Sequence, residues 1–205
     1  QYWVWSQNPS LSYLTKGPFV ASIISLSNSI FGQSYLGLKF FSLLAYVGTI
    51  IFIAYSSIAL KKDKNIGTTA LLITGLSPAV FFLGGVASTD IYLFFFWSLA
   101  LFGYIKFTLN KDVRWFYFIA IATGLGLLTK LSMALLPISI LIYFLFTEYR
   151  KYFYSIHLYF SALLAILIAS PIVIWNINND WLTLSHEMGH LVSGAPSNNP
   201  EILLM

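Results

Sequence analysis

The sequence contains no cysteine, which excludes disulfides, thiolate nucleophiles and cysteine-ligated metal sites. Charged residues are also scarce, at 9% of the 205 positions, whereas about a quarter of the residues in soluble domains are charged. Hydrophobic residues make up 58% of the whole chain, and its mean hydropathy is +0.79. This composition indicates an integral membrane protein. The net charge of +4 gives no sign of nucleic-acid binding, because the basic residues stand at the ends of apolar segments.

The two ends of the chain also lack expected features. The sequence begins at Gln1 without an initiator methionine or a signal-like region, and it stops at Met205 within the apolar stretch "ILLM". We therefore expect a fragment without its natural ends. An active site predicted from it would then lack some of its residues, and the fragment by itself is expected to be inactive.

Long apolar segments predict an all-α, multi-pass transmembrane bundle over residues 36–176. A helix needs about 20 apolar residues to cross a bilayer. Residues 115–146 are apolar except for Lys130 near their middle, and a single helix of that length would be roughly 48 Å long, against a hydrocarbon core of about 30 Å. We expect two short helices there, with Lys130 at the turn, and about six spans in total. The other four predicted spans are residues 40–60, 66–87, 91–109 and 153–175.

The basic residues predict how the bundle is oriented. Eight of the eleven Lys and Arg residues lie in three stretches, 61–64, 106–114 and 148–151, which alternate spans place on one side. The positive-inside rule makes that side cytoplasmic. The isolated polar residues, and the tail with "HEMGH", then collect on the other face. This clustering is the first indication of a functional site there.

Residues 1–35 differ from the predicted spans. They are rich in Trp and Tyr and are interrupted by Pro9 and by the Gly17–Pro18 pair, and the apolar run 19–31 is too short to span well. Aromatic residues favour the membrane interface. We expect helices that lie along the outer surface as a lid or wall, with residues 177–205 as the start of another outer loop.

Several stretches occur in an order typical of one family. The segment "YWVWSQNPSLSYLTKGPFVASIISLSNSIFG" is followed by "GLKF", "STD", "GLGLLTK" and "WNINNDW". This ordered set resembles the membrane glycosyltransferases of family 39 type, the relatives of protein O-mannosyltransferases and of the transferase that adds aminoarabinose to lipid A. The resemblance implies a GT-C fold in a bacterial inner membrane. It also implies a polyprenyl-phosphate-linked sugar donor and a protein, lipid or glycan acceptor.

The resemblance also implies site residues. An acidic residue shortly before the "YWxWSQ" stretch is the family's expected base, and Gln1 begins too late to include it. Lys16 corresponds to a basic residue associated with the donor phosphate, although Gly17 stands where a proline is expected. Asp90 corresponds to the acidic residue of a Thr-Pro-Asp motif and is the catalytic candidate here. Lys130 corresponds to the basic residue that follows a Gly-Leu-Gly-rich span.

These residue types suit the implied chemistry. Displacing a polyprenyl phosphate needs a base for the acceptor hydroxyl and cations for the charge that grows on the phosphate. Lys16 and Lys130 can supply the positive charge, and Asp90 could orient the acceptor or help to hold a divalent metal. The alternatives are structural: "STD" could only cap a helix, and both lysines could be anchors whose charged ends reach the interface.

The segment "HEMGH" has two interpretations. It matches H-E-x-x-H, in which two histidines bind zinc and the glutamate activates water, so a membrane zinc metalloprotease is the alternative function. Aligned with the family on Trp181, it is instead a variant of a substrate-binding segment, with Glu187 at a Gln position and His190 at a His position. A zinc site would need a third ligand, and only Glu201 follows. We therefore favour the glycosyltransferase, with no metal ligands assigned.

Overall fold

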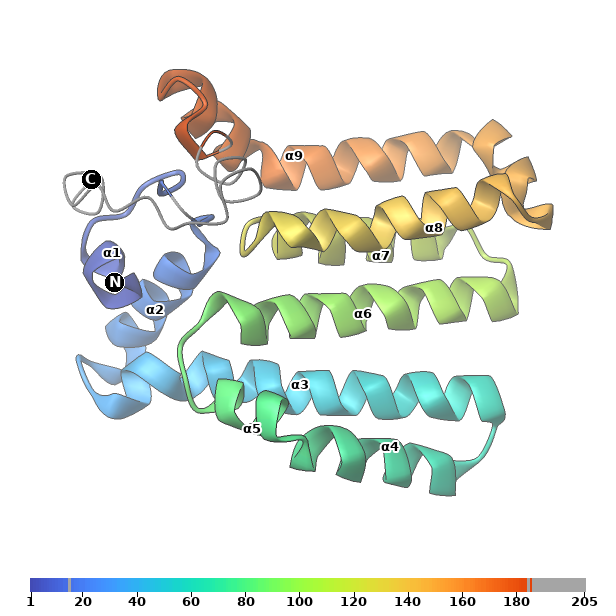
Figure 1. The fold of residues 1–205 in the computed structure, drawn as a ribbon, viewed down its shortest axis with the longest axis horizontal. Helices are drawn as coiled ribbons and strands as arrows, with labels where there is room; N and C mark the ends of the chain where they lie inside the picture. Colours follow the sequence, from blue (N-terminus) through green and yellow to red (C-terminus); the bar gives the residue numbers. More distant parts are fainter. Residues whose placement is uncertain (15, 184, 186–205) are drawn as a thin grey trace.

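The structure is a computed structural model that describes residues 1–14, 16–183 and 185. These residues form helices and connecting loops, with no β-strand among them. Three helices are long and apolar enough to cross a membrane, namely α3 (Tyr35–Lys61), α6 (Thr89–Asn110) and α9 (Ile156–Asn178), and they run the length of a layered bundle (Figure 1). The predicted all-α membrane fold is confirmed.

The second predicted span, residues 66–87, is a broken one. The structure divides it into α4 (Lys64–Leu76) and α5 (Pro78–Gly84), which meet at an angle of 66°. Pro78 explains the break, because it lacks an N–H group and disfavours helical backbone at the preceding residue, Ser77. The Tyr46 hydroxyl of α3 donates to the Gly75 carbonyl oxygen at 2.6 Å, which satisfies an acceptor that the end of α4 leaves open.

Residues 115–146 form two short segments, as predicted. Helix α7 (Arg114–Leu127) ends just before Lys130, and the chain then returns through the 3₁₀ turn η1 (Leu131–Ala134) and α8 (Leu135–Leu145). A second 3₁₀ segment, η2 (Glu148–Tyr154), leads to α9 and bends by 108° from α8. By length and composition, the described residues hold three to five spans. Helix α7, with 14 residues, is shorter than the roughly 20 that a span needs. The total of six spans therefore stays a prediction.

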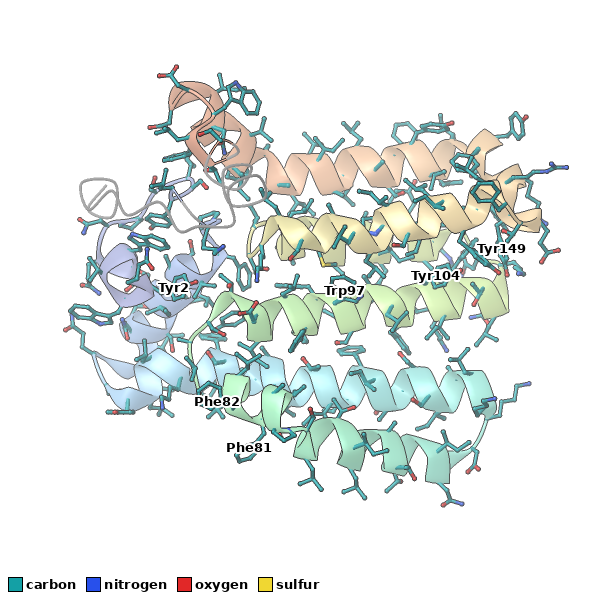
Figure 2. All side chains as sticks on the ribbon, in the orientation of Figure 1. Tyr2, Phe81, Phe82, Trp97, Tyr104 and Tyr149 are labelled. Atoms are coloured by element: carbon teal, nitrogen blue, oxygen red, sulfur yellow. The ribbon has the colours of Figure 1, made fainter. Side chains whose placement is uncertain are left out.

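Helix α6 lies at the centre of the core. Ile91, Tyr92, Phe96 and Ala100 are buried along it, against α3 on one side and α7 on the other. Glycines allow the helices to approach closely: a Cβ atom at Gly124 of α7 would lie 2.7 Å from the Ile168 Cβ atom of α9. Figure 2 shows how side chains fill the space between the helices.

The N-terminal helices α1 (Tyr2–Gln7) and α2 (Phe19–Phe31) lie together at one end of the bundle (Figure 1). Helix α2 buries one face, where Val20, Ile24 and Ser27 are almost inaccessible. The Phe19 ring packs edge-on against Phe96 of α6, with centroids 5.1 Å apart. The predicted helices in residues 1–35 are therefore present; their position at a membrane surface stays a prediction.

The two ends of the bundle differ in composition. The loops after α3, after α6 and around η2 lie at one end, on the right in Figure 1, and they hold most of the basic residues. We call this the basic end. Helices α1 and α2, the connection into α6, the turn after α7 and the end of α9 lie at the opposite end (Figure 1). Tyr2 and Tyr149 mark the two ends in Figure 2.

Candidate functional site

A narrow pocket opens at the end opposite the basic end, where four chain segments meet. The loop between α1 and α2, the turn between α7 and η1, the end of α9 and the segment after it all contribute. We call it the two-lysine pocket. Its lining residues are Ser12, Lys16, Gly17, Lys130, Leu131, Ile172 and Thr183. The structure thus brings together Lys16 and Lys130, both predicted as substrate-binding residues.

Tyr13 holds the loop that carries Lys16. Its ring stacks on Trp5 with centroids 4.5 Å apart. Its hydroxyl lies 3.0 Å from the backbone oxygens of both Trp5 and Asn8, which share its single proton. The Tyr13 amide donates to the Lys16 carbonyl oxygen at 3.1 Å. Burial raises the pKa of the Tyr13 hydroxyl, and this effect outweighs the opposing effect of the hydrogen bond from the Ser10 amide. The hydroxyl therefore remains protonated and able to donate.

Gly17 lets this loop sit directly on the end of α7. A Cβ atom at Gly17 would collide with the Leu128 carbonyl oxygen and lie 2.6 Å from the Leu128 carbonyl carbon. The same oxygen accepts a hydrogen bond from the Phe19 amide at 3.1 Å. Glycine at the position where the family resemblance predicts proline is therefore a packing requirement here, because no side chain fits.

Lys130 is placed by the end of α7. The Gly126 carbonyl oxygen accepts from the Thr129 hydroxyl at 2.6 Å and from the Lys130 amide at 3.1 Å. The backbone of Lys130 is then extended, with φ −158°, as the chain turns into η1. This geometry ends the helix and directs the Lys130 side chain across to α6.

Lys130 and Asp90 form an ion pair. The Lys130 Nζ atom donates to the Asp90 Oδ1 atom at 2.8 Å, and the two side chains are 36% and 41% exposed. Asp90 lies in the first turn of α6, where Ser88 occupies the N-cap position. Asp90 is thus not the N-cap residue itself, and its carboxylate binds Lys130 from the first turn of the helix. It is absent from the residues that line the two-lysine pocket, and its catalytic role stays a prediction.

The end of α9 supplies the remaining wall. The buried Asn176 side chain donates to the Ile172 carbonyl oxygen at 2.9 Å and accepts from the Thr183 amide at 3.2 Å. Asp180 and Trp181 have positive φ values of 52° and 57°, which turn the chain back toward the bundle. Sequence reasoning missed Asn176 as a positioning residue and Ser12 as a lining residue. The polar "WNINNDW" stretch could have pointed to Asn176, whereas nothing distinguished Ser12 from its neighbours.

The "HEMGH" segment lies outside the described residues, so His186, Glu187 and His190 have no structural assignment. Their predicted roles, as substrate-binding residues or as part of a zinc site, remain predictions. Among the residues that the structure does describe, no group of three or more His, Asp and Glu side chains is placed to hold a metal ion.

Comparison with known proteins gives a family and two relatives. Residues 15–175 match the protein family described as dolichyl-phosphate-mannose-protein mannosyltransferase. The chain is 27% identical over 197 residues to lipid A galacturonosyltransferase RgtD of Rhizobium johnstonii, which covers 91% of this chain and 39% of that protein. An uncharacterized protein of Aquifex aeolicus is 29% identical over 157 residues, covering 76% of this chain and 32% of that protein. No solved structure gives a significant match.

The matched regions cover part of each relative and most of the candidate site. The chain spans well under half the length of both relatives. The family match includes Lys16, Asp90 and Lys130 and ends before "HEMGH". Neither the family nor the named relative supports a zinc protease.

Proposed function

The chain belongs to the dolichyl-phosphate-mannose-protein mannosyltransferase family, and on this basis we propose that the native protein is a membrane glycosyltransferase. It takes a sugar from a polyprenyl-phosphate-linked donor and transfers it to an acceptor hydroxyl on the non-cytoplasmic face. The apolar helices and the family together make it an integral membrane protein. Because both relatives are bacterial, we propose the bacterial inner membrane as its location.

One observation carries the proposal: two lysines from distant parts of the sequence line one pocket at the end away from the basic loops. A sugar that leaves a polyprenyl phosphate leaves negative charge on the phosphate oxygens. Cations held in fixed positions stabilise that charge as it develops. In this proposal Lys16 and Lys130 bind the phosphate, and Asp90 acts as a positioning residue that holds Lys130 at the pocket.

The sidedness supports the same proposal. The basic end is expected to face the cytoplasm, which puts the two-lysine pocket near the outer headgroup region. A lipid-linked phosphate in that leaflet would lie at the depth of the pocket, while its hydrocarbon chain stays among the apolar helices. The sugar is then exposed to acceptors outside the cell membrane.

The names of the family and of one relative suggest classes of acceptor. The family description names a protein acceptor and mannose, whereas the relative from Rhizobium johnstonii is named for lipid A and galacturonic acid. We propose a hexosyl or pentosyl transfer to a protein, lipid or glycan hydroxyl. Transfer assays with labelled acceptors of each class would separate these outcomes.

Native mass spectrometry of the intact protein in mild detergent tests the donor. We expect a retained polyprenyl phosphate in the wild-type protein and its loss in Lys16→Ala, because hydrogen bonds to charged groups contribute about 1.5–3 kcal/mol, roughly a tenfold to hundredfold change in affinity. Lys39→Ala is the matched control. Lys39 lies at the same end, over the Tyr35 ring at 5.0 Å, and is absent from the pocket lining.

The same spectra test the alternative function. A bound zinc ion that disappears in His186→Ala, together with no lipid phosphate in any sample, would overturn the glycosyltransferase proposal in favour of the zinc protease. Equal lipid phosphate in Lys16→Ala and Lys39→Ala would remove Lys16 from the donor site.

A further inference from the structure

Two hydroxyl groups in the two-lysine pocket are buried without a hydrogen-bond partner. Ser12 is 1% exposed and Thr183 is 4% exposed, and neither side-chain oxygen has a partner within the described part of the chain. Buried hydroxyls are nearly always satisfied by protein or water, because leaving one unpaired is costly. These two therefore need an explanation.

Local backbone groups do not supply the partner. Some hydroxyls elsewhere in this structure bond to a carbonyl oxygen three or four residues earlier, as Thr49 does to Ala45 and Thr129 to Gly126. Ser27, Ser56 and Thr123 are buried and unpaired within the described residues, as Ser12 and Thr183 are, but they lie on helices away from the two-lysine pocket. Ser12 lies in the loop fixed by Tyr13, outside any helix. The amide of Thr183 is already bonded to Asn176, so the backbone there is fixed while the hydroxyl remains unpaired.

Both hydroxyls line the same pocket as Lys16 and Lys130. A lysine ammonium attracts an anion as a point charge but directs it weakly, since its three donors rotate and its stem is flexible. A hydroxyl on a fixed backbone donates from one place and so orients the anion. The pocket thus offers two cationic side chains and two hydroxyl donors. Among its described lining residues there is no carboxylate, although Asp90 pairs with Lys130 beside it.

We propose that Ser12 and Thr183 are phosphate-binding residues, which donate hydrogen bonds to an oxygen atom of the phosphate group that Lys16 and Lys130 attract. This inference rests on the proposed function and deepens it. The pocket has a free volume of about 10 Å³, room for about one water-sized group, so in this proposal a single phosphate oxygen enters it. The two hydroxyls donate to that oxygen and so fix the orientation of the phosphate that the lysines attract. No bond is made or broken by either hydroxyl.

The proposal predicts effects of opposite sign on stability and on binding. If the hydroxyl is unpaired until a ligand binds, replacing it with an apolar group removes the cost of burying it unpaired. The unliganded protein then keeps or gains thermal stability. The same removal deletes a donor to a charged phosphate, so binding weakens. A hydroxyl that supports only the fold, or that binds a structural water, would show a loss of stability without ligand.

The test uses the native protein in detergent, with undecaprenyl phosphate as the probe. Thermal unfolding is measured without probe and across a titration, for the wild type, Ser12→Ala and Thr183→Val. Thr183→Ser, which retains the hydroxyl, is the rescue variant. Ser56→Ala is the matched control: Ser56 is also buried and unpaired within the described residues, but it lies on α3 near the basic end.

We expect Ser12→Ala and Thr183→Val each to weaken probe binding about tenfold, with an unliganded unfolding temperature at or above that of the wild type. Thr183→Ser and Ser56→Ala should bind like the wild type. Wild-type affinity in both Ser12→Ala and Thr183→Val, or a lower unliganded unfolding temperature in both, overturns this inference alone. Absence of probe binding in the wild type overturns the proposed function itself.

Discussion

At the scale of single residues, the ion pair between Asp90 and Lys130 is the contact that changes an interpretation most. The sequence presented Asp90 as the catalytic candidate and Lys130 as a separate phosphate ligand. In the structure the Lys130 Nζ atom lies 2.8 Å from the Asp90 Oδ1 atom, although the two residues are 40 positions apart in the sequence. A carboxylate bound to a lysine orients that lysine and neutralises part of its charge. The proposed positioning role of Asp90 rests on this arrangement, and its catalytic role stays a prediction.

The first prediction concerns this pair. Because exposed ion pairs contribute about 0–1 kcal/mol and both side chains are over a third exposed, Asp90→Asn should change the free energy of unfolding very little. Transfer activity should fall about tenfold as Lys130 loses its orientation. Thermal unfolding and a transfer assay with a lipid-linked sugar measure the two effects.

A double variant decides how Asp90 acts. If it acts only through Lys130, Asp90→Asn combined with Lys130→Gln should be no less active than Lys130→Gln alone. A further loss of tenfold or more in the double variant would show that Asp90 contributes directly to the reaction. The catalytic interpretation of Asp90 would then be correct.

At the scale of elements, the pocket depends on a loop that lies against a helix end. The loop between α1 and α2 is closed by Tyr13 and seated on α7 through the contact of Gly17 with Leu128. Helix α7 ends at this point, and its turn carries Lys130. Lys16 and Lys130 therefore reach one pocket because two chain segments without regular helical structure meet there.

The second prediction tests that contact. Gly17→Ala places a methyl group against backbone atoms of Leu128, which cannot rotate away. We expect a loss of about 1–3 kcal/mol in the free energy of unfolding, as is typical of overpacking. The loop should also be cleaved more readily in limited proteolysis, because it no longer seats on α7.

Gly85→Ala is the control for this substitution. Gly85 has φ −84°, and a Cβ atom there would lie 3.5 Å from the Phe82 carbonyl oxygen, an ordinary contact. This variant should be neutral or slightly more stable, since alanine restricts the unfolded chain. Equal stability of the two variants would mean that the loop does not need the close approach at Gly17.

At the scale of the whole molecule, charge separates the two ends of the bundle. Lys111 at the basic end donates to the Tyr149 hydroxyl, and this hydrogen bond raises the pKa of Lys111, so the ammonium stays charged. Arg114 lowers the pKa of Asp112 through a side-chain hydrogen bond. The same hydrogen bond raises the pKa of Arg114. Lys111 and Arg114 thus keep the charge on which the positive-inside rule depends.

The third prediction is the orientation. These 205 residues contain no cysteine, so single cysteines can be introduced at exposed positions here, after any cysteine elsewhere in the native protein has been replaced by serine. Gln33→Cys lies between α2 and α3, at the end with the pocket, and Asn65→Cys lies in the first turn of α4, at the basic end. A membrane-impermeant maleimide should label Gln33→Cys in intact spheroplasts and Asn65→Cys only after permeabilisation. The reverse pattern would put the pocket on the cytoplasmic side.

Much of the bundle could be predicted from composition and periodicity alone. Apolar runs gave the helices, and the length of residues 115–146 gave the turn at Lys130, because a bilayer limits how long a straight helix can be. The break at Pro78 was missed, since the apolar run continues through it while the backbone does not. Ser12 was missed because one serine in a polar loop carries no pattern.

The sequence by itself determined that this is a helical membrane protein, that its basic loops share one end, and that its isolated polar residues gather at the other. These features depend on local hydropathy and on the thickness of a bilayer, which act on each segment separately. Only the tertiary structure decided which of those polar residues meet. The pairing of Asp90 with Lys130, and the pocket shared by Ser12, Lys16, Lys130 and Thr183, depend on how the loop, the α7 turn and the end of α9 pack together. Such packing joins residues far apart in the chain, so no local pattern encodes it.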